Sequence, residues 1–290
     1  MLGAVVDMTR SFHSTLCILI LAAGCKAENA SSPSEKTPPT QTEVKPATPP
    51  AGPAASNLAA GILIGEKGGV RVSELKGSPK FPAARLAQSA PADDAKLAPG
   101  KVAFSYEVLN YELTAQTVAN PPLANSGQGQ HIHFIVDNGP YLAQYAPNFE
   151  VELTEGHHVI LAFLSRSYHE AVKSDGAAVV KVVTVGEPSE PKPDLSGPTL
   201  FYSRPKGAYE ATDHKMLLLD FYLLNTTLSE DGNKVRALIN GNEFVLSKWV
   251  PYVIEGLPAG ELTIELELID KDGKPIPGPF NKVKRMVELK

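Results

Sequence analysis

The run His131-Ile-His-Phe-Ile-Val-Asp-Asn-Gly-Pro-Tyr141 alternates polar and apolar residues and ends in turn-forming Asp, Asn, Gly and Pro. This pattern is typical of a half-buried β-strand that leads into a tight turn. A similar run, Lys234-Val-Arg-Ala-Leu-Ile-Asn-Gly-Asn-Glu-Phe244, follows later in the chain. We interpret the two runs as one strand that is present twice.

The blocks around these strands repeat in the same order. Phe104-Ser-Tyr-Glu-Val-Leu-Asn110 matches Leu219-Asp-Phe-Tyr-Leu-Leu-Asn225, and the stretch from Leu153 to Leu164 matches that from Leu257 to Leu268. Colinear blocks of this kind indicate an internal duplication. Each copy has roughly a hundred residues and about seven short strands without helical periodicity. The predicted fold class is all-β, with two tandem immunoglobulin-like β-sandwiches after a signal peptide and a disordered tether.

The N-terminal segment predicts export and lipid attachment. Residues from Met8 to Cys25 have a basic start, a short apolar run and small residues before the cysteine, which is the pattern of a signal peptide. Leu21-Ala-Ala-Gly-Cys25 resembles the lipobox of bacterial lipoproteins, which implies cleavage before Cys25 and its acylation. The apolar run is far shorter than the roughly 20 residues that a spanning helix needs. The alternative is an ordinary secretory signal.

Composition then sets the expected boundaries. The segment after Cys25 is rich in Pro, Ala, Ser and Thr and has few bulky apolar residues, so it predicts an extended tether. A proline-rich stretch later in the chain predicts a hinge. The expected parts are a signal peptide at 1–24, a lipidated cysteine and tether at 25–80, a first sandwich at 81–186, a linker at 187–196 and a second sandwich at 197–290.

Charge and cysteine content exclude several functions. The 290 residues carry a formal net charge of -5 and no evident basic cluster, which argues against nucleic-acid binding. Both cysteines, Cys17 and Cys25, lie in the N-terminal segment, so we expect neither disulfides nor a cysteine metal cluster in the folded part. The sequence also lacks the usual hydrolase, phosphate-loop and zinc-protease motifs, and we predict that the protein is not an enzyme.

Histidines are concentrated in the first copy. Of seven histidines, five lie between His131 and His169. Strand alternation separates His131 and His133 from the apolar residues of their run, and the second copy has Lys234 and Arg236 in their places, so we expect both histidines to face outward.

Alignment of the copies predicts a metal site on this outer face. His157 aligns with a glutamate of the second copy and is therefore also expected to face outward, next to His131 and His133 if the two strands are neighbours. With His169 from the following loop, these imidazoles form a candidate site for zinc or copper. The alternative is a polar sheet face without metal, because Lys234 and Arg236 occupy the equivalent positions of the second copy.

A loop of the first copy is a second candidate site. Arg166, Tyr168, His169 and Glu170 gather charged and polar groups that suit an anion or another polar ligand, since arginine binds carboxylate and phosphate in a bidentate manner. The nearby segment 115–130 is longer than its counterpart in the second copy, and such loops commonly carry recognition. An ordinary variable loop is the alternative.

Three runs resemble a known family: Gly127-Gln-Gly-Gln-His-Ile-His-Phe-Ile-Val-Asp137, Phe163-Leu-Ser-Arg-Ser-Tyr-His-Glu170 and Leu218-Leu-Asp-Phe-Tyr-Leu-Leu-Asn-Thr-Thr227. They are similar to a family of two-repeat immunoglobulin-like bacterial envelope lipoproteins, some of whose members are labelled phosphopeptide-binding. The resemblance covers the chain from Phe81 to Lys290. It implies a protein anchored by lipid in the cell envelope. We predict a location at the outer membrane and a structural role or a protein, peptide or glycan ligand, with the site on the first repeat.

Overall fold

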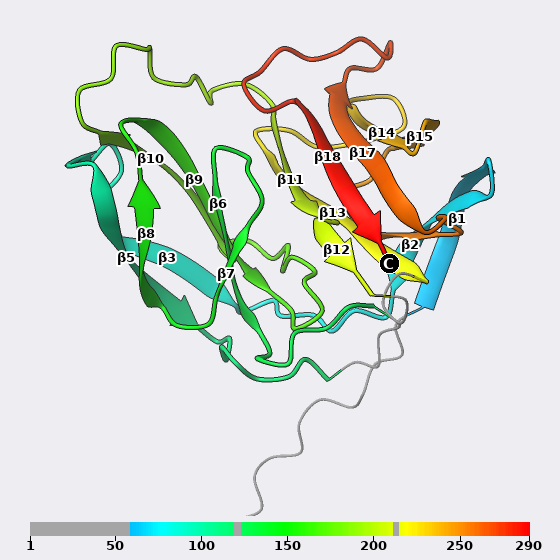
Figure 1. Cartoon of the computed structure of the whole chain (residues 1–290), viewed down its shortest axis with the longest axis horizontal. Helices are drawn as coiled ribbons and strands as arrows, with labels where there is room; N and C mark the ends of the chain where they lie inside the picture. Colours follow the sequence, from blue (N-terminus) through cyan, green and yellow to red (C-terminus); the bar gives the residue numbers. More distant parts are fainter. Residues whose placement is uncertain (1–58, 119–122, 211–214) are drawn as a thin grey trace, which may run out of the picture. The chain divides into compact units, whose positions relative to one another are not determined.

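The computed structural model describes residues 59–118, 123–210 and 215–290. All helices and strands assigned in these ranges reduce to one type, because the regular secondary structure there consists of β-strands (Figure 1). No helix in these ranges has the length and apolar character needed to cross a membrane. The predicted signal peptide, the lipidation site at Cys25 and the tether as far as residue 58 lie outside the described residues.

The first sandwich consists of two sheets, with strand orders β3-β5-β8 and β4-β10-β9-β6-β7. Their inward-facing side chains, including Phe104, Ile132, Phe134 and Ile160, form one apolar core, because alternate residues of each strand point to the same face. The strands are β3 (Arg85–Ala90), β4 (Lys96–Leu97), β5 (Gly100–Leu109), β6 (His131–Val136), β7 (Leu142–Gln144), β8 (Asn148–Leu153), β9 (Gly156–Ser165) and β10 (Ala178–Val185).

The second sandwich repeats this arrangement strand for strand. Its sheets contain the orders β11-β13-β16 and β12-β18-β17-β14-β15, and the short strand pairs β4-β10 and β12-β18 are both parallel. The predicted all-β fold with two tandem sandwiches is confirmed, as is the internal duplication. The strands are β11 (Thr199–Arg204), β12 (Gly207–Tyr209), β13 (Met216–Leu224), β14 (Lys234–Ile239), β15 (Asn242–Leu246), β16 (Tyr252–Glu255), β17 (Gly260–Ile269) and β18 (Lys282–Leu289).

Part of the predicted tether is folded. Strands β1 (Ala59–Lys67) and β2 (Val70–Lys76) form a hairpin, and β2 pairs with β16, so the three-stranded sheet of the second sandwich becomes five-stranded. Val70 and Val72 are buried in the second core. The prediction of a tether up to residue 80 is therefore wrong for 59–76, because an apolar alternation there finds a partner strand that is distant in sequence.

The outer face of the sheet that contains β6, β9 and β10 is also buried. Ile135, Leu161 and Phe163 pack in one apolar cluster with Phe201 of β11 and Tyr222 of β13. Phe163 and Tyr222 stack with their ring centroids 5.7 Å apart. This sheet thus has apolar residues on both faces. Its inner face packs in the core of the first sandwich, and its outer face is covered by the second sandwich.

Polar side chains join the same two surfaces. Asn138 accepts a hydrogen bond from the backbone amide of Tyr202 and donates to the carbonyl of Leu200. Arg285 of β18 donates to the carbonyls of Tyr202, Asn138 and Gly139. The bonds to Leu200 and Tyr202 satisfy backbone groups of the edge strand β11.

Candidate metal centre: a histidine triad

Three of the predicted ligands converge on one point, and we call them the histidine triad: His131, His133 and His169. The distance from His131 Nε2 is 3.0 Å to His133 Nε2 and 3.1 Å to His169 Nδ1, and the distance between the latter two atoms is 3.4 Å. His131 and His133 lie on β6, and His131 pairs with Ser165 at the end of β9. The loop that carries His169 begins there, and this position brings the third imidazole to the other two.

The triad is buried rather than exposed. His131 and His133 point away from the core of the first sandwich, as predicted, but both have 0% exposed surface. The prediction that they face solvent is wrong, because the second sandwich covers this side of the sheet. A buried imidazole requires a hydrogen-bond or metal partner for its ring nitrogens.

The tautomer of His131 is fixed by the backbone. Its Nδ1 lies 2.8 Å from the carbonyl oxygen of Gly129, and since a carbonyl can only accept, Nδ1 carries the proton. The lone pair of Nε2 therefore faces the other two histidines. Gly129 has a φ of 84°, and a Cβ at this position would lie 2.1 Å from the carbonyl oxygen of Thr114, so a side chain does not fit there.

His133 is held from two sides. Its Nδ1 lies 3.2 Å from Ser203 Oγ, which belongs to β11 of the second sandwich. Its ring stacks on Tyr141 with centroids 3.6 Å apart and an interplanar angle of 8°. The hydroxyl of Tyr141 in turn lies 3.1 Å from His169 Nδ1. A hydrogen bond such as that of Ser203, to the ring nitrogen that faces away from the triad, commonly orients a histidine ligand of a metal.

Electrostatics keep the triad neutral. Burial lowers the pKa of His131 to about 4, with smaller contributions from Arg204 and Lys206. Burial also lowers the pKa of His133 well below its usual value, and lowers that of His169, where Arg204 adds to the effect. Neutral imidazoles are the form that binds metals.

The spacing of the three nitrogens matches a metal site. A point can lie about 2.0–2.1 Å from all three atoms, the normal zinc–nitrogen distance, if it is about 0.9 Å out of their plane. This is the position of the ion in a tetrahedral site with three ligands in its base. A fourth position then remains on the side to which the ion is displaced.

His157 does not belong to the triad. Strands β6 and β9 are antiparallel, so His131 lies beside Ser165, whereas His157 is eight positions away, about 27 Å along an extended strand. Its Nδ1 lies 2.9 Å from Thr184 Oγ1. The neighbouring His158 pairs with Asp137 at 2.6 Å. The prediction of His157 as a ligand is therefore wrong, because sequence reasoning supplied the face but not the register.

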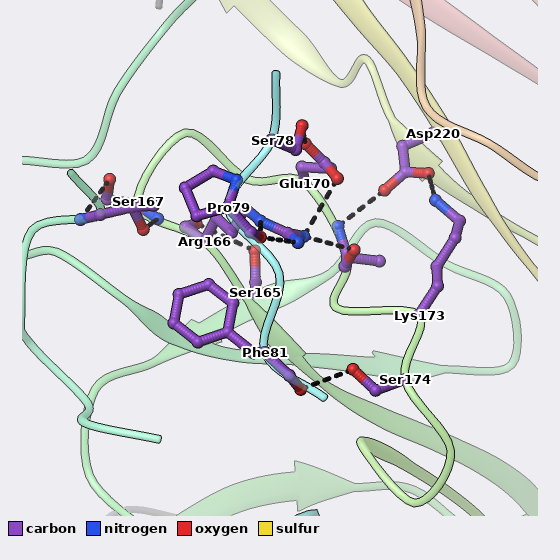
Figure 2. Close-up of polar contacts among 12 residues, drawn as sticks. Ser78, Pro79, Phe81, Ser165, Arg166, Ser167, Glu170, Lys173, Ser174 and Asp220 are labelled. Atoms are coloured by element: carbon purple, nitrogen blue, oxygen red, sulfur yellow. Dashed lines mark hydrogen bonds and ion pairs between the residues drawn. The ribbon is translucent and has the colours of Figure 1, made fainter. Parts of the chain in front are cut away.

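The predicted ligand-binding loop supports the chain before β3 (Figure 2). Arg166 donates from Nε and Nη2 to the carbonyl of Pro79 at 3.1 and 2.5 Å, and from Nη1 to the carbonyl of Ala171 at 2.8 Å. The same guanidinium pairs with Glu170 at 3.0 Å, and Ser78 donates to Glu170. These groups hold the segment that connects β2 with β3.

Tyr168 of this loop is also structural. It is 1% exposed and packs with Leu75, Leu123, Leu218 and Val253. Of the four residues predicted to bind a polar ligand, His169 alone joins the triad. Ligand binding by Arg166, Tyr168 and Glu170 stays a prediction, and their contacts give them a role in the fold.

Residues 115–118 and Gln130 of the longer segment border a groove of about 660 Å³. Phe81, Tyr111, Gln116 and Gln130 are among the residues that line it. Thr117 and Ser167 exchange hydrogen bonds between this segment and the loop that carries His169. The segment therefore connects to the loop of the triad.

Sequence reasoning missed four residues around the triad: Tyr141, Ser203, Arg204 and Lys206. Tyr141 ends the run that opens with His131, and strand alternation gives no sign that the chain turns back onto His133. The other three lie in the second copy. The one available signal is the pair Arg204 and Lys206, which adds positive charge next to a turn.

No family model and no curated protein matches the chain. Among solved structures, fibronectin(III)-like modules of Clostridium thermocellum CbhA are 14% identical, with 71% of this chain and 94% of that chain covered and a TM-score of 0.26. The central fibronectin-III array of RIM-binding protein is also 14% identical, with 72% and 70% covered and a TM-score of 0.23. A Bacteroides ovatus glucan-utilisation protein, SGBP-B, solved with a mixed-linkage heptasaccharide, is 14% identical, with 71% and 47% covered and a TM-score of 0.22. At these TM-scores the matches give no information on function.

Proposed function

We propose that this protein binds a transition metal ion, zinc or copper, through His131, His133 and His169. The observation that carries the proposal is the set of three nitrogen–nitrogen distances, 3.0, 3.1 and 3.4 Å, because they place three imidazoles around one metal-sized position. Three histidines form a typical ligand set for zinc, and imidazole also suits copper.

The position of the proton on His131 supports a cation at the centre of the triad. The Nε2 lone pair of His131 points at two other ring nitrogens, and lone pairs that face each other at this distance repel unless a proton or a metal ion lies between them. A metal ion satisfies all three nitrogens together, whereas without it one proton must be shared by two of them and the third, on His169, depends on the hydroxyl of Tyr141. The low pKa of His131, about 4, means that protons compete weakly for the site at neutral pH.

The N-terminal sequence supports a place in the bacterial envelope. The lipobox-like Leu21-Ala-Ala-Gly-Cys25 supports lipid anchoring, and the resemblance to two-repeat envelope lipoproteins supports the same location. Complete burial of His131 and His133 favours holding an ion over turning over a substrate. We therefore propose a non-enzymatic, lipid-anchored, metal-binding protein of the envelope.

Calorimetric titration of the full chain with zinc(II) and copper(II) tests this proposal. Cys17 and Cys25 are replaced by Ser in all samples, because thiols bind both metals strongly. We expect one ion per chain and a loss of affinity of about a hundredfold or more in His131→Gln and His169→Gln. His157→Gln is the matched control and keeps the full affinity, since its imidazole lies on Thr184.

Circular dichroism verifies that each variant is folded before titration. A cobalt(II) absorption spectrum of the protein with its histidines intact provides a measurement that does not depend on variants, because tetrahedral and octahedral cobalt differ strongly in intensity. Absence of any metal binding, or equal binding by His131→Gln and His157→Gln, would refute the proposal.

A further inference from the structure

The groove beside the segment 115–130 has the size and the chemistry of a ligand site. Its volume of about 660 Å³ is within the range of roughly 300–1,000 Å³ that is typical of small-molecule sites. Two aromatic rings, those of Phe81 and Tyr111, line it together with amide and hydroxyl side chains and the carboxylate of Glu112. The described residues that line it include no lysine, arginine or histidine. The groove therefore lacks the cations that recognise phosphate or carboxylate ligands.

Several polar side chains of the groove are already engaged within the protein. Gln130 donates from Nε2 to the carbonyl of Glu112 and accepts a hydrogen bond from the hydroxyl of Thr117. Gln116 donates to two carbonyls of its own segment. The carboxylate of Glu112, in contrast, forms no hydrogen bond or ion pair with any residue that the structure describes, and Asn110 uses its amide nitrogen but not its Oδ1. The groups left for a ligand are therefore mainly acceptors.

Tyr111 adds a hydroxyl that has no partner. The residue is 9% exposed, and its hydroxyl is buried without a hydrogen bond to any described residue. Burial of an unpaired hydroxyl is unfavourable and rare in native proteins, which indicates that a group from outside the chain pairs with it. The ring of Phe81 meets that of Tyr111 edge to face, with centroids 4.8 Å apart, and remains partly exposed. An apolar ring thus lies next to the unpaired hydroxyl.

This combination fits a sugar better than a peptide. A sugar ring has C–H groups with a slight positive charge, which complement the negative face of an aromatic ring, and hydroxyl donors around its edge. An extended peptide normally binds through main-chain hydrogen bonds to a free strand edge. The backbone amides of Thr114, Thr117 and Gln130 are already bonded within the protein, so the segment offers no such edge at these positions.

We propose that this groove binds a neutral glycan, with a sugar ring against Phe81 and its hydroxyl groups on Asn110, Tyr111 and Glu112. The site goes beyond the proposed metal binding, because no histidine of the triad lines the groove. The two proposals therefore stand or fall separately.

The test is binding of the full chain, again with both cysteines replaced by Ser, to an array of immobilised neutral oligosaccharides that includes chitotetraose and cellotetraose. Calorimetry then gives the affinity for the oligosaccharide that binds best. We expect Tyr111→Phe and Glu112→Gln each to lower this affinity about tenfold, through the loss of one hydrogen bond. Both variants should fold, since the hydroxyl of Tyr111 has no partner among the described residues and Glu112 is exposed. Glu107→Gln is the matched control and keeps the affinity, because this exposed carboxylate on β5 lies outside the groove.

A tetralysine peptide and a salt series separate a glycan site from a site for cations. Contacts with a neutral sugar are not screened by salt, so the affinity for the oligosaccharide should stay the same as the ionic strength rises. Binding of tetralysine without binding of any oligosaccharide would overturn the proposal and show a site for basic peptides. Absence of binding across the whole array, or equal affinities of Glu107→Gln, Glu112→Gln and Tyr111→Phe, would overturn it as well.

Discussion

Strands β6 and β14 are the same strand in two copies, yet their outward-facing side chains meet opposite environments. His131 and His133 of β6 lie under the second sandwich with 0% exposed surface. Their counterparts on β14 lie half-buried at the surface, where Arg236 pairs with Glu267 and donates to the carbonyl of Gly273. The outer face of each duplicated sheet therefore takes its residue types from what covers it.

Exchange of the outward-facing residues between the copies is expected to have the largest effect. His131→Lys/His133→Arg buries two cations beside Arg204 and Lys206, and each uncompensated charge costs about 3–5 kcal/mol, enough to unfold a domain of ordinary stability. The reverse exchange, Lys234→His/Arg236→His, costs about 1 kcal/mol, because Glu267 still pairs with Lys282.

Urea unfolding in the presence of a chelator measures both exchanges without a contribution from metal. The neutral pair His131→Gln/His133→Gln is the control that separates charge from shape, and it should lose less stability than the charged pair. Similar losses in the two reciprocal exchanges would contradict the explanation by burial.

A second pair of equivalent positions is Ser105 on β5 and Asp220 on β13. Asp220 is completely buried, accepts a hydrogen bond from the Ala171 amide at 2.8 Å and pairs with Lys173 of the first sandwich (Figure 2). Asp220→Ala should therefore lower the free energy of unfolding by about 3 kcal/mol, since it leaves a buried amide and a lysine without their partner.

Ser105→Ala should change the stability by less than about 0.5 kcal/mol, because the position is half-buried and away from this contact. Thermal unfolding followed by circular dichroism compares the two variants. Equal effects would show that Asp220 does not join the sandwiches in the way its contacts indicate.

The smallest expected effect concerns Ser203 and its counterpart Ser89. Ser203 is buried and orients His133, whereas Ser89 is exposed and donates to the carbonyl of Ser105. Ser203→Ala should weaken zinc binding about tenfold through the loss of this orientation, with little change in fold, and Ser89→Ala should leave it unchanged. Competition with a coloured zinc chelator measures the difference. An unaltered zinc affinity in Ser203→Ala would show that the second sandwich does not contribute to the metal site.

Much of the fold and part of the site follow from local patterns. Alternation predicts the strands, because side-chain direction along a strand depends only on parity. The colinear blocks predict the duplication. The same rule placed His131 and His133 on one face opposite Ile132. It also led to the wrong choice of His157, because parity carries no information on which end of β9 lies beside His131.

The sequence by itself determined which residues share a face and that one β-unit is present twice. Only the tertiary structure decided that β2 completes the sheet of the second sandwich, that the outer face of β6 is buried, and that Tyr141 and Ser203 meet the histidines. These features depend on contacts between segments far apart in the chain, where packing of whole apolar faces, rather than any local preference, has the largest free energy.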